Sequence, residues 1–518
     1  MAKVNLLDCT LRDGGYINEW NFGIKAIKGI MRKLENTGIE MIEVGFLKGR
    51  DYNPSKTLFP DTDSIKAILE NKQDNVTYVA MLDMSAPIDI KKIMPNDGTS
   101  VDGIRVIFKK NKIKEAYDTC KQVKALGYKV FVNFVSTDAY SDKEFIEGIE
   151  LFNTLNPDGV TIVDTFGSIR RRQFRRLVAI ADNNLNEGIM LCYHAHNNLQ
   201  QAFGNAEIMV EMNLKRDIVI DACVFGMGRG AGNLNLELFA EYMNDNFNTA
   251  YRIQPMLEIM DEYLTPFYKT KFWGYSLPLY LSAINGCHPN YAIHLAEKNT
   301  LSEKALNELL ENISDEDKYV FSKEKAESYY AEYMSGAVDD VEAIEELKSI
   351  FYGKRVLLLA PGKTLQNHAA DIKGRINENT IVLSVNFYDE MFPITFVFVG
   401  NNRRYNQIVG EGARIIATSN ILDSDEAEYV INVRNLVGED KEIVDNSALM
   451  ALKLLLKLGV TNVEIAGMDG GNTQRSYYKE GFEAYRAESI IRDEVVAEKI
   501  KSLREKIAVK FITPTNYE

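Results

Sequence analysis

Eight apolar, strand-like segments alternate with amphipathic, helix-like segments through the first half of this 518-residue chain. The strand-like segments are residues 4–8, 41–46, 76–82, 103–108, 129–135, 159–164, 189–193 and 218–224. The stretches between them, such as 24–37 and 113–125, are long enough to return the chain parallel to the preceding strand. Eight strand–helix units in about 245 residues match a (β/α)8 barrel, whereas a doubly wound sheet more often has five or six strands. We therefore predict a TIM barrel over residues 1–254.

Two further regions follow the predicted barrel. Residues 255–350 have a helical pattern rich in aromatic side chains, and we expect them to form a helical extension that packs on the barrel. Residues 351–518 alternate again between strands and helices, with strand candidates at 355–359, 381–385, 395–399, 413–418, 429–433 and 463–466. The predicted fold class is α/β, a TIM barrel with a helical extension followed by a Rossmann-like α/β domain.

Composition narrows the class of protein. A net charge of −14 argues against nucleic acid or an anionic membrane surface as the main partner. The five cysteines have no CxxC spacing, and several lie inside apolar strands, which indicates buried thiols in a reducing compartment. No run approaches the ~18 apolar residues of a membrane span, and we expect no signal peptide because the N-terminus enters a strand directly. These features predict a soluble, cytoplasmic protein.

Polar residues follow several of the predicted strands, and parallel strands bring their carboxyl ends to one face of a barrel. His194 and His196 are two residues apart on a strand, so both imidazoles can meet one ion. Asp13 offers a carboxylate and Asn233 a neutral oxygen. Nitrogen and oxygen ligands without thiolate suit Mn²⁺ or Mg²⁺ first, and also Co²⁺, Fe²⁺ or Zn²⁺.

Three motifs in this order resemble those of the DRE-TIM metallolyase superfamily, which includes 4-hydroxy-2-oxovalerate aldolase, HMG-CoA lyase, and the isopropylmalate and homocitrate synthases. They are Asp8-x-Thr10-Leu11-Arg12-Asp13-Gly14, His194-x-His196-Asn197 and Gly226-x-Gly228-x-Gly230-Ala231-Gly232-Asn233. The resemblance covers about the first 280 residues.

The resemblance implies a role for each matching position. Asp13, His194, His196 and Asn233 would hold a divalent metal, and Arg12 would stabilise an enolate oxygen. Glu43, Arg105 and Thr165 would line the substrate. The activity implied is that of an aldolase or lyase that makes or breaks a carbon–carbon bond next to a 2-oxo acid, through the enolate of pyruvate.

One position departs from the family pattern. The aldolases have an acid/base histidine two residues after the RDG motif, where this chain has Tyr16. Tyr16 is a candidate proton relay, although a phenol with a pKa near ~10 is a poor base at neutral pH. His288 or Tyr291, from the turn at residues 287–291, is the other candidate for the missing group.

The C-terminal region has a weaker resemblance, carried by Leu359-Ala360-Pro361-Gly362-Lys363-Thr364-Leu365, Ser384-Val385-Asn386 and Gly467-Met468-Asp469. These segments look like the Rossmann-like domains of sialyltransferase-like and DUF115 proteins, which handle nucleotide-activated substrates. The resemblance makes Gly362, Thr364, Asn386 and Asp469 candidate nucleotide-binding residues. A P-loop is excluded because Leu357 stands where that motif requires glycine.

Three hypotheses on function remain open at this point. The first is the metal-dependent aldolase or lyase, in surface-polysaccharide or unusual-sugar synthesis, with a 2-oxo acid as substrate. The second is a Claisen-type synthase that uses an acyl-CoA, and the third is a nucleotide-sugar transferase or binding protein that works through the C-terminal domain. A homodimer is expected, because barrels of this family are commonly dimeric.

Overall fold

A computed structural model describes residues 2–298, 301, 303–334, 338–421, 424–437, 446–470 and 489–518. The chain divides into two compact units, residues 1–289 and 290–518. This division falls inside the stretch predicted as one helical extension, and the three-part organisation with boundaries at 254 and 350 stays a prediction. Within the described ranges, no helix is long and apolar enough to cross a membrane.

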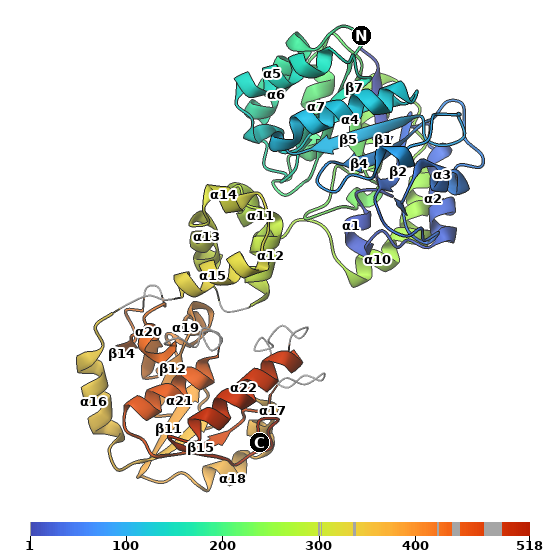
Figure 1. The fold of residues 1–518 in the computed structure, drawn as a ribbon. Coiled ribbons are helices and arrows are strands. Elements are labelled where there is room, and N and C mark those ends of the chain that lie inside the picture. Colours follow the sequence, from blue (N-terminus) through green and yellow to red (C-terminus); the bar gives the residue numbers. More distant parts are fainter. Residues whose placement is uncertain are drawn as a thin grey trace. The chain divides into compact units, whose positions relative to one another are not determined.

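The first unit contains a closed barrel of eight parallel strands (Figure 1). The strands are β1 (Val4–Asp8), β2 (Met41–Leu47), β4 (Thr77–Asp83), β5 (Gly103–Phe108), β6 (Lys129–Phe134), β7 (Gly159–Asp164), β8 (Met190–Ala195) and β9 (Ile218–Ala222). The barrel closes because β1 pairs with both β9 and β2, and the two-residue β3 (Leu58–Phe59) adds to β2. The predicted TIM barrel is confirmed.

Helices surround this barrel, and their apolar faces pack against the outward-pointing strand residues. They are α2 (Ile24–Glu35), α3 (Thr62–Ile65), α4 (Ile113–Ala125), α5 (Asp142–Asn153), α6 (Arg171–Asn184), α7 (Ala202–Glu211) and α8 (Leu236–Phe247). The short α1 (Gly15–Asn18) follows the RDG motif directly. The first unit ends with α9 (Gln254–Ile259), a π-helical turn (Met260–Leu264), α10 (Thr265–Thr270) and α11 (Leu277–Ile284).

Strand alternation builds the barrel interior in layers. An apolar layer fills the interior, with Leu7, Met41, Val79, Phe131, Cys192 and Val219 among its members. Residues two positions further along a strand point to the same side. From Met41, Phe131, Cys192 and Val219 that rule places Glu43, Asn133, His194 and Asp221 in the next layer toward the carboxyl ends. Arg105 joins this layer through its ion pairs with Glu43 and Asp221, and all five residues are buried. A polar layer therefore lies on an apolar one, at the end of the barrel where its loops can form a site.

The second unit contains helices followed by a parallel sheet. The helices before the sheet are α12 (Pro289–Glu297), α13 (Glu303–Glu311), α14 (Asp315–Lys318), α15 (Lys323–Tyr333) and α16 (Val341–Phe351). The sheet has the order β14-β13-β12-β11-β10-β15-β16. Its strands are β10 (Arg355–Leu359), β11 (Thr380–Val385), β12 (Phe396–Val399), β13 (Ile415–Thr418), β14 (Tyr429–Ile431), β15 (Asn462–Ala466) and β16 (Ala508–Phe511). The parallel α/β architecture is as expected, with β16 as a strand that the sequence pattern did not indicate.

Both faces of this sheet are covered, as a parallel sheet requires. Val356 and Leu358 of β10 join one apolar cluster with α16, α21 (Ser447–Lys457) and α22 (Ser489–Leu503). Leu357 and Leu359 point the other way, into a second cluster that includes residues of α17 (Lys363–Asn367) and α18 (Ala369–Lys373). Two further short helices, α19 (Asn402–Ile408) and α20 (Val433–Val437), follow β12 and β14.

Candidate metal centre in the barrel

A closed ring of charged side chains occupies the polar layer of the barrel. Arg12 contacts Asp13 through Nη1 and Glu43 through Nε, the latter at 2.6 Å. Arg105 continues the ring, 3.3 Å from Glu43 and 2.5 Å from Asp221. His194 closes it, with Nδ1 at 3.0 Å from Asp221 and Nε2 at 3.3 Å from Asp13. We call these six residues the charged ring; all of them are buried.

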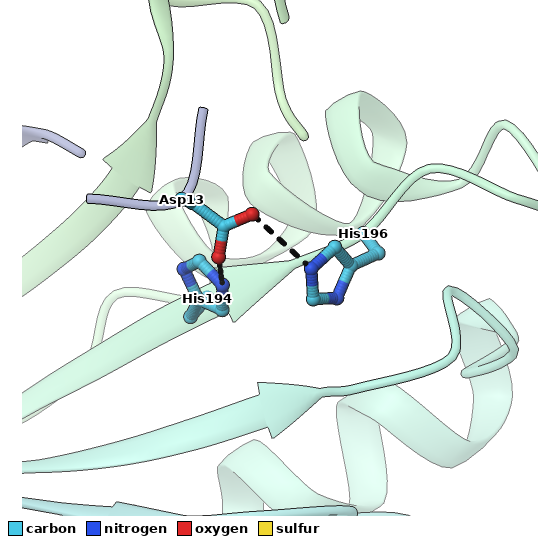
Figure 2. A group of neighbouring side chains, drawn as sticks. All are labelled: Asp13, His194 and His196. Carbon is cyan, nitrogen blue, oxygen red and sulfur yellow. Dashed lines mark ion pairs between the residues drawn. The ribbon is translucent and has the colours of Figure 1, made fainter. Parts of the chain in front are cut away.

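Asp13, His194 and His196 form the candidate metal centre (Figure 2). One possible ligand atom from each of the three lies within 4.8 Å of the others. Asp13 Oδ2 lies 3.3 Å from His194 Nε2, and Asp13 Oδ1 lies 3.5 Å from His196 Nε2. The two histidines come from the end of β8 and the residue after it, and Asp13 comes from the loop after β1.

Two buried atoms at this centre fit a cation. Within the described part of the chain, Nε2 of His196 and Oδ1 of Asn233 have no hydrogen-bond partner. Asn233 is held in place by its backbone bridge to His196 and by Nδ2, which donates to the Met227 carbonyl at 3.3 Å. Gly228 makes room for it, because a Cβ there would lie 2.2 Å from Asn233 Nδ2. Buried polar atoms normally have partners, so the four residues fit a divalent cation.

The electrostatics favour the ligand forms of Asp13 and His196, whereas hydrogen bonds to Asp13 and Asp221 outweigh burial and raise the pKa of His194. Burial alone would raise the pKa of Asp13, but the charge of Arg12 and the contacts with the two histidines outweigh burial and hold this pKa well below its usual value. Burial lowers the pKa of His196 despite the nearby carboxylate, so its imidazole is neutral at pH 7. His194 has Asp221 on Nδ1, and such a second partner fixes the ring orientation of a metal-ligating histidine.

Arg12 presents a free donor beside this centre. Its Nε and Nη1 are engaged by the two carboxylates, but its Nη2 is buried without a hydrogen-bond partner among the described residues. A guanidinium nitrogen carries hydrogen atoms that point away from the carbon, so Nη2 is available to an oxygen of a ligand. This is the geometry needed to stabilise an oxyanion.

The acid/base candidates lie in different places. Tyr16 is 37% exposed, packs on the ring of Trp20 with centroids 4.8 Å apart, and has a raised pKa because of desolvation and the charge of Asp13. His288 contacts the guanidinium of Arg229, and burial with that charge lowers its pKa to about 3. Tyr291 packs inside the second unit, where its hydroxyl donates to the Val320 carbonyl at 3.2 Å. A catalytic role for each of the three stays a prediction.

The three residues predicted to line the substrate all have partners within the barrel. Glu43 and Arg105 are members of the charged ring, and among the described residues they form ion pairs with other ring members. Thr165 follows β7, and its hydroxyl accepts from the amide of Ser136 at 2.8 Å. A direct contact of these three with substrate also stays a prediction.

The predicted nucleotide-binding residues are brought together only in part. The Gly362 amide donates to the Gly467 carbonyl at 2.7 Å, and the Thr364 amide donates to Asp469 at 2.9 Å. The Thr364 hydroxyl contacts the same carboxylate. Asn386 follows β11 and accepts from the Gly400 amide at 3.4 Å. The amides that would bind a phosphate are thus donated within the protein, and the nucleotide site stays a prediction.

Sequence reasoning missed Asp221 and Arg229. Asp221 is an acid inside the apolar run Ile218-Val219-Ile220-Asp221-Ala222, two positions after the interior residue Val219. Because residues two positions apart on a strand point to the same side, the sequence already indicated that Asp221 faces the barrel interior. A buried carboxylate in that position needs a partner. Arg229 lies between two glycines of the loop after β9, and nothing in the spacing of the residues indicated its contact with His288.

The chain is similar to proteins of known class over this barrel. The family model described as HMGL-like matches residues 3–261, half of the chain. The 4-hydroxy-2-oxovalerate aldolase of Carboxydothermus hydrogenoformans is 24% identical over 268 residues, which are 51% of this chain and 78% of that protein. The corresponding aldolase of Thermomicrobium roseum is 29% identical over 257 residues, covering 47% and 67%.

Among solved structures, the HMG-CoA lyase of Brucella melitensis is 16% identical, with a TM-score of 0.41 over 52% of this chain and 99% of that chain. HMGL-like proteins are part of the DRE-TIM metallolyase superfamily, whose members depend on a divalent metal. The match of the family model to half of the chain decides the assignment. The chain belongs to the HMGL-like family and is a metal-dependent carbon–carbon lyase of the aldolase type.

Proposed function

We propose that the barrel cleaves or forms the carbon–carbon bond next to a 2-oxo acid, with the enolate of pyruvate as intermediate. The observation that carries this proposal is the unpartnered Arg12 Nη2 beside a centre of Asp13, His194 and His196. Two of the relatives similar to this chain are named 4-hydroxy-2-oxovalerate aldolases, which supports the substrate class.

Asp13, His194, His196 and Asn233 would hold the cation, with Mn²⁺ or Mg²⁺ as the leading candidates for this donor set. When bound, such a cation supplies Lewis-acid polarisation of the keto oxygen. Arg12 places a fixed positive charge and a free donor where negative charge develops on that oxygen. The charged ring keeps Arg12 in place, because Glu43 holds its Nε at 2.6 Å.

In the cleavage direction the proton of the C4 hydroxyl passes to a base, the C3–C4 bond breaks, and an aldehyde leaves. The bonding pair becomes the enolate, and the conjugate acid of that base, or solvent water, returns one proton to C3 to give pyruvate. The raised pKa of Tyr16 keeps its phenol protonated at pH 7, so we assign it as the proton donor to the alkoxide in the condensation direction. His288, with a pKa of about 3, is a weaker acid/base candidate.

Pyruvate release tests this proposal directly. The purified chain is stripped with EDTA, reloaded with Mn²⁺, and assayed with lactate dehydrogenase and NADH across a series of 4-hydroxy-2-oxo acids. We expect Mn²⁺-dependent pyruvate release in the wild type and none in Asp13→Asn. Free thiol release from acetyl-CoA with a 2-oxo acid, without pyruvate release from any substrate, would instead support the Claisen-type synthase.

A second function is proposed for the second unit, in which a nucleotide-activated ligand binds at its sheet. The order of the strands supports it, because the connections reverse direction between β10 and β15, and ligands of open α/β sheets bind at such a switch point. Gly362, Thr364, Asn386 and Asp469 follow β10, β11 and β15. Nucleotide-dependent thermal stabilisation of the full chain, lost in Asp469→Ala, is the expected result.

Two further proposals concern the setting. We propose a homodimer, in keeping with the family, and a role in surface-polysaccharide or unusual-sugar synthesis, in keeping with a sugar-nucleotide ligand. Light scattering in solution tests the first. The second fails if the purified chain binds no nucleotide sugar.

A further inference from the structure

Arg229 occupies an unusual position at the mouth of the barrel. Its loop follows β9 and carries Asn233, and its backbone amide lies 3.4 Å from Asp13 Oδ1. Gly230 beside it has a φ of +65°, and a Cβ there would lie 2.8 Å from Asn198 Oδ1. Asn198 in turn accepts from the Ala231 amide at 2.8 Å. The backbone from which the Arg229 side chain projects is therefore fixed next to the candidate metal centre.

The guanidinium of Arg229 lacks the partner that other buried arginines of the barrel have. Arg12, Arg105 and Arg216 are each paired with carboxylates. The half-buried Arg229 instead contacts the His288 ring and lies with Cζ 5.8 Å from the Tyr16 ring centroid. No carboxylate of the described residues forms an ion pair with it.

Its two neighbours do not supply a negative charge. Burial and the charges of Arg229 and Lys109 lower the pKa of His288 to about 3, so this imidazole is neutral at pH 7. Desolvation and the charge of Asp13 raise the pKa of Tyr16, so the phenol is also neutral. A half-desolvated guanidinium between two uncharged rings is stabilised by an anion, and guanidinium suits carboxylate and phosphate oxygens.

Arg229 lies close to both the candidate metal centre and Tyr16, because its amide is 3.4 Å from Asp13 Oδ1 and its Cζ is 5.8 Å from the Tyr16 ring centroid. A 2-oxo acid bound by its keto end at Asp13 and the two histidines would have its remaining carbons free to reach these side chains. Tyr16, Arg229 and His288 are the side chains gathered there. We infer that Arg229 binds a second anionic group, a carboxylate or a phosphate, on the aldehyde half of the substrate. This inference rests on the proposed function and names its substrate class, a 2-oxo acid with an anionic far end.

A matched pair of ligands tests the inference without turnover. 2-Oxoadipate and 2-oxohexanoate have the same chain length and differ only in the terminal carboxylate. Binding of each to the Mn²⁺-loaded protein is measured by calorimetry for wild type, Arg229→Ala and Arg229→Lys. Charge-assisted hydrogen bonds predict that wild type binds 2-oxoadipate at least ~10-fold more tightly than 2-oxohexanoate. We expect Arg229→Ala to abolish this preference and Arg229→Lys to restore part of it.

The control variant is Arg172→Ala, which removes the same charge from the exposed face of α6 and should keep the preference. Equal binding of both ligands by wild type, or a preference that survives in Arg229→Ala, would overturn the inference and leave the proposed function standing. Failure of both ligands to bind would instead contradict the proposed function, and the inference with it.

Condensation of pyruvate with three aldehydes separates the two anion types. Propanal is neutral, succinate semialdehyde carries a carboxylate, and glycolaldehyde phosphate carries a phosphate. The expected result is a higher kcat/KM for one anionic aldehyde than for propanal, reduced at least ~10-fold in Arg229→Ala. An equal reduction for propanal would show that Arg229 acts only on the loop, which contradicts the inference.

Discussion

Asp221 is the residue whose replacement tests the charged ring most sharply. Its Oδ2 lies 2.5 Å from Arg105 Nη2 and 3.0 Å from His194 Nδ1, and all three side chains are buried. Asp221→Asn keeps the shape and removes the charge. It leaves Arg105 with Glu43 at 3.3 Å as its remaining ion-pair partner in the ring.

The expected loss has two parts. Removing one partner of a buried ion pair costs about 3–5 kcal/mol of unfolding free energy, because the other charge stays buried without full compensation. His194 loses the carboxylate that orients its ring, and loss of such a partner weakens metal affinity by about 10–100-fold. The pKa of Asp221 supports this dependence, because Arg105 and His194 lower it although burial alone would raise it.

Urea unfolding in EDTA measures the first part, and Mn²⁺ titration calorimetry measures the second. Asp217→Asn is the control, since Asp217 is an exposed carboxylate just before the same strand and should change stability by less than about 0.5 kcal/mol. A loss below about 1 kcal/mol for Asp221→Asn, with Mn²⁺ affinity unchanged, would refute the reasoning that the ring supports the centre.

Three other predictions follow from the same geometry. Arg12→Lys should lower kcat by about 10²–10³ at saturating Mn²⁺ in the pyruvate-release assay, because the oriented Nη2 donor is lost; a change under tenfold would contradict its role. Gly228→Ala should weaken Mn²⁺ binding at least ~10-fold in calorimetry, because the new Cβ would displace Asn233, whereas Gly49→Ala has open space and should bind normally. Burial raises the pKa of Asp8 to about 7. The neutral carboxyl of Asp8 therefore contributes fully to the free energy of unfolding below about pH 4, and this contribution is lost as the pH rises through 7. Relative to Asp8→Asn in EDTA, the wild type should lose about 3 kcal/mol of unfolding free energy between pH 5 and pH 8, and a constant difference would exclude this titration.

The barrel could be predicted because its physical signals are local. Strands of a parallel barrel are buried on both faces and appear in the sequence as apolar runs. The helices between them are recognised by the different spacing of their apolar residues. The predicted strand at 103–108 agrees with β5, and the one at 41–46 differs from β2 by one residue. The β16 strand was missed because Ala508–Phe511 is a short sheet-edge segment with an exposed lysine, which resembles a polar connection.

The candidate centre could be proposed for a similar reason. Alternation places His194 and His196 on one side of β8, and parallel strand ends meet at one mouth, so Asp13 joins them. Long-range pairings such as Arg105 with Asp221 have no signal in sequence spacing. The turn at 287–291 was predicted to supply one group from either His288 or Tyr291. The boundary between the compact units falls between these two residues. The position of this boundary depends on tertiary packing.

Metal content and pyruvate release, measured together on wild type and His196→Ala, test the central claim most directly. We expect about one equivalent of divalent metal and metal-dependent pyruvate release in the wild type. We expect both to be lost in His196→Ala, whose replaced Nε2 is a buried atom without a hydrogen-bond partner among the described residues. Wild-type protein that binds no divalent metal, or that releases pyruvate equally well in EDTA, would contradict it.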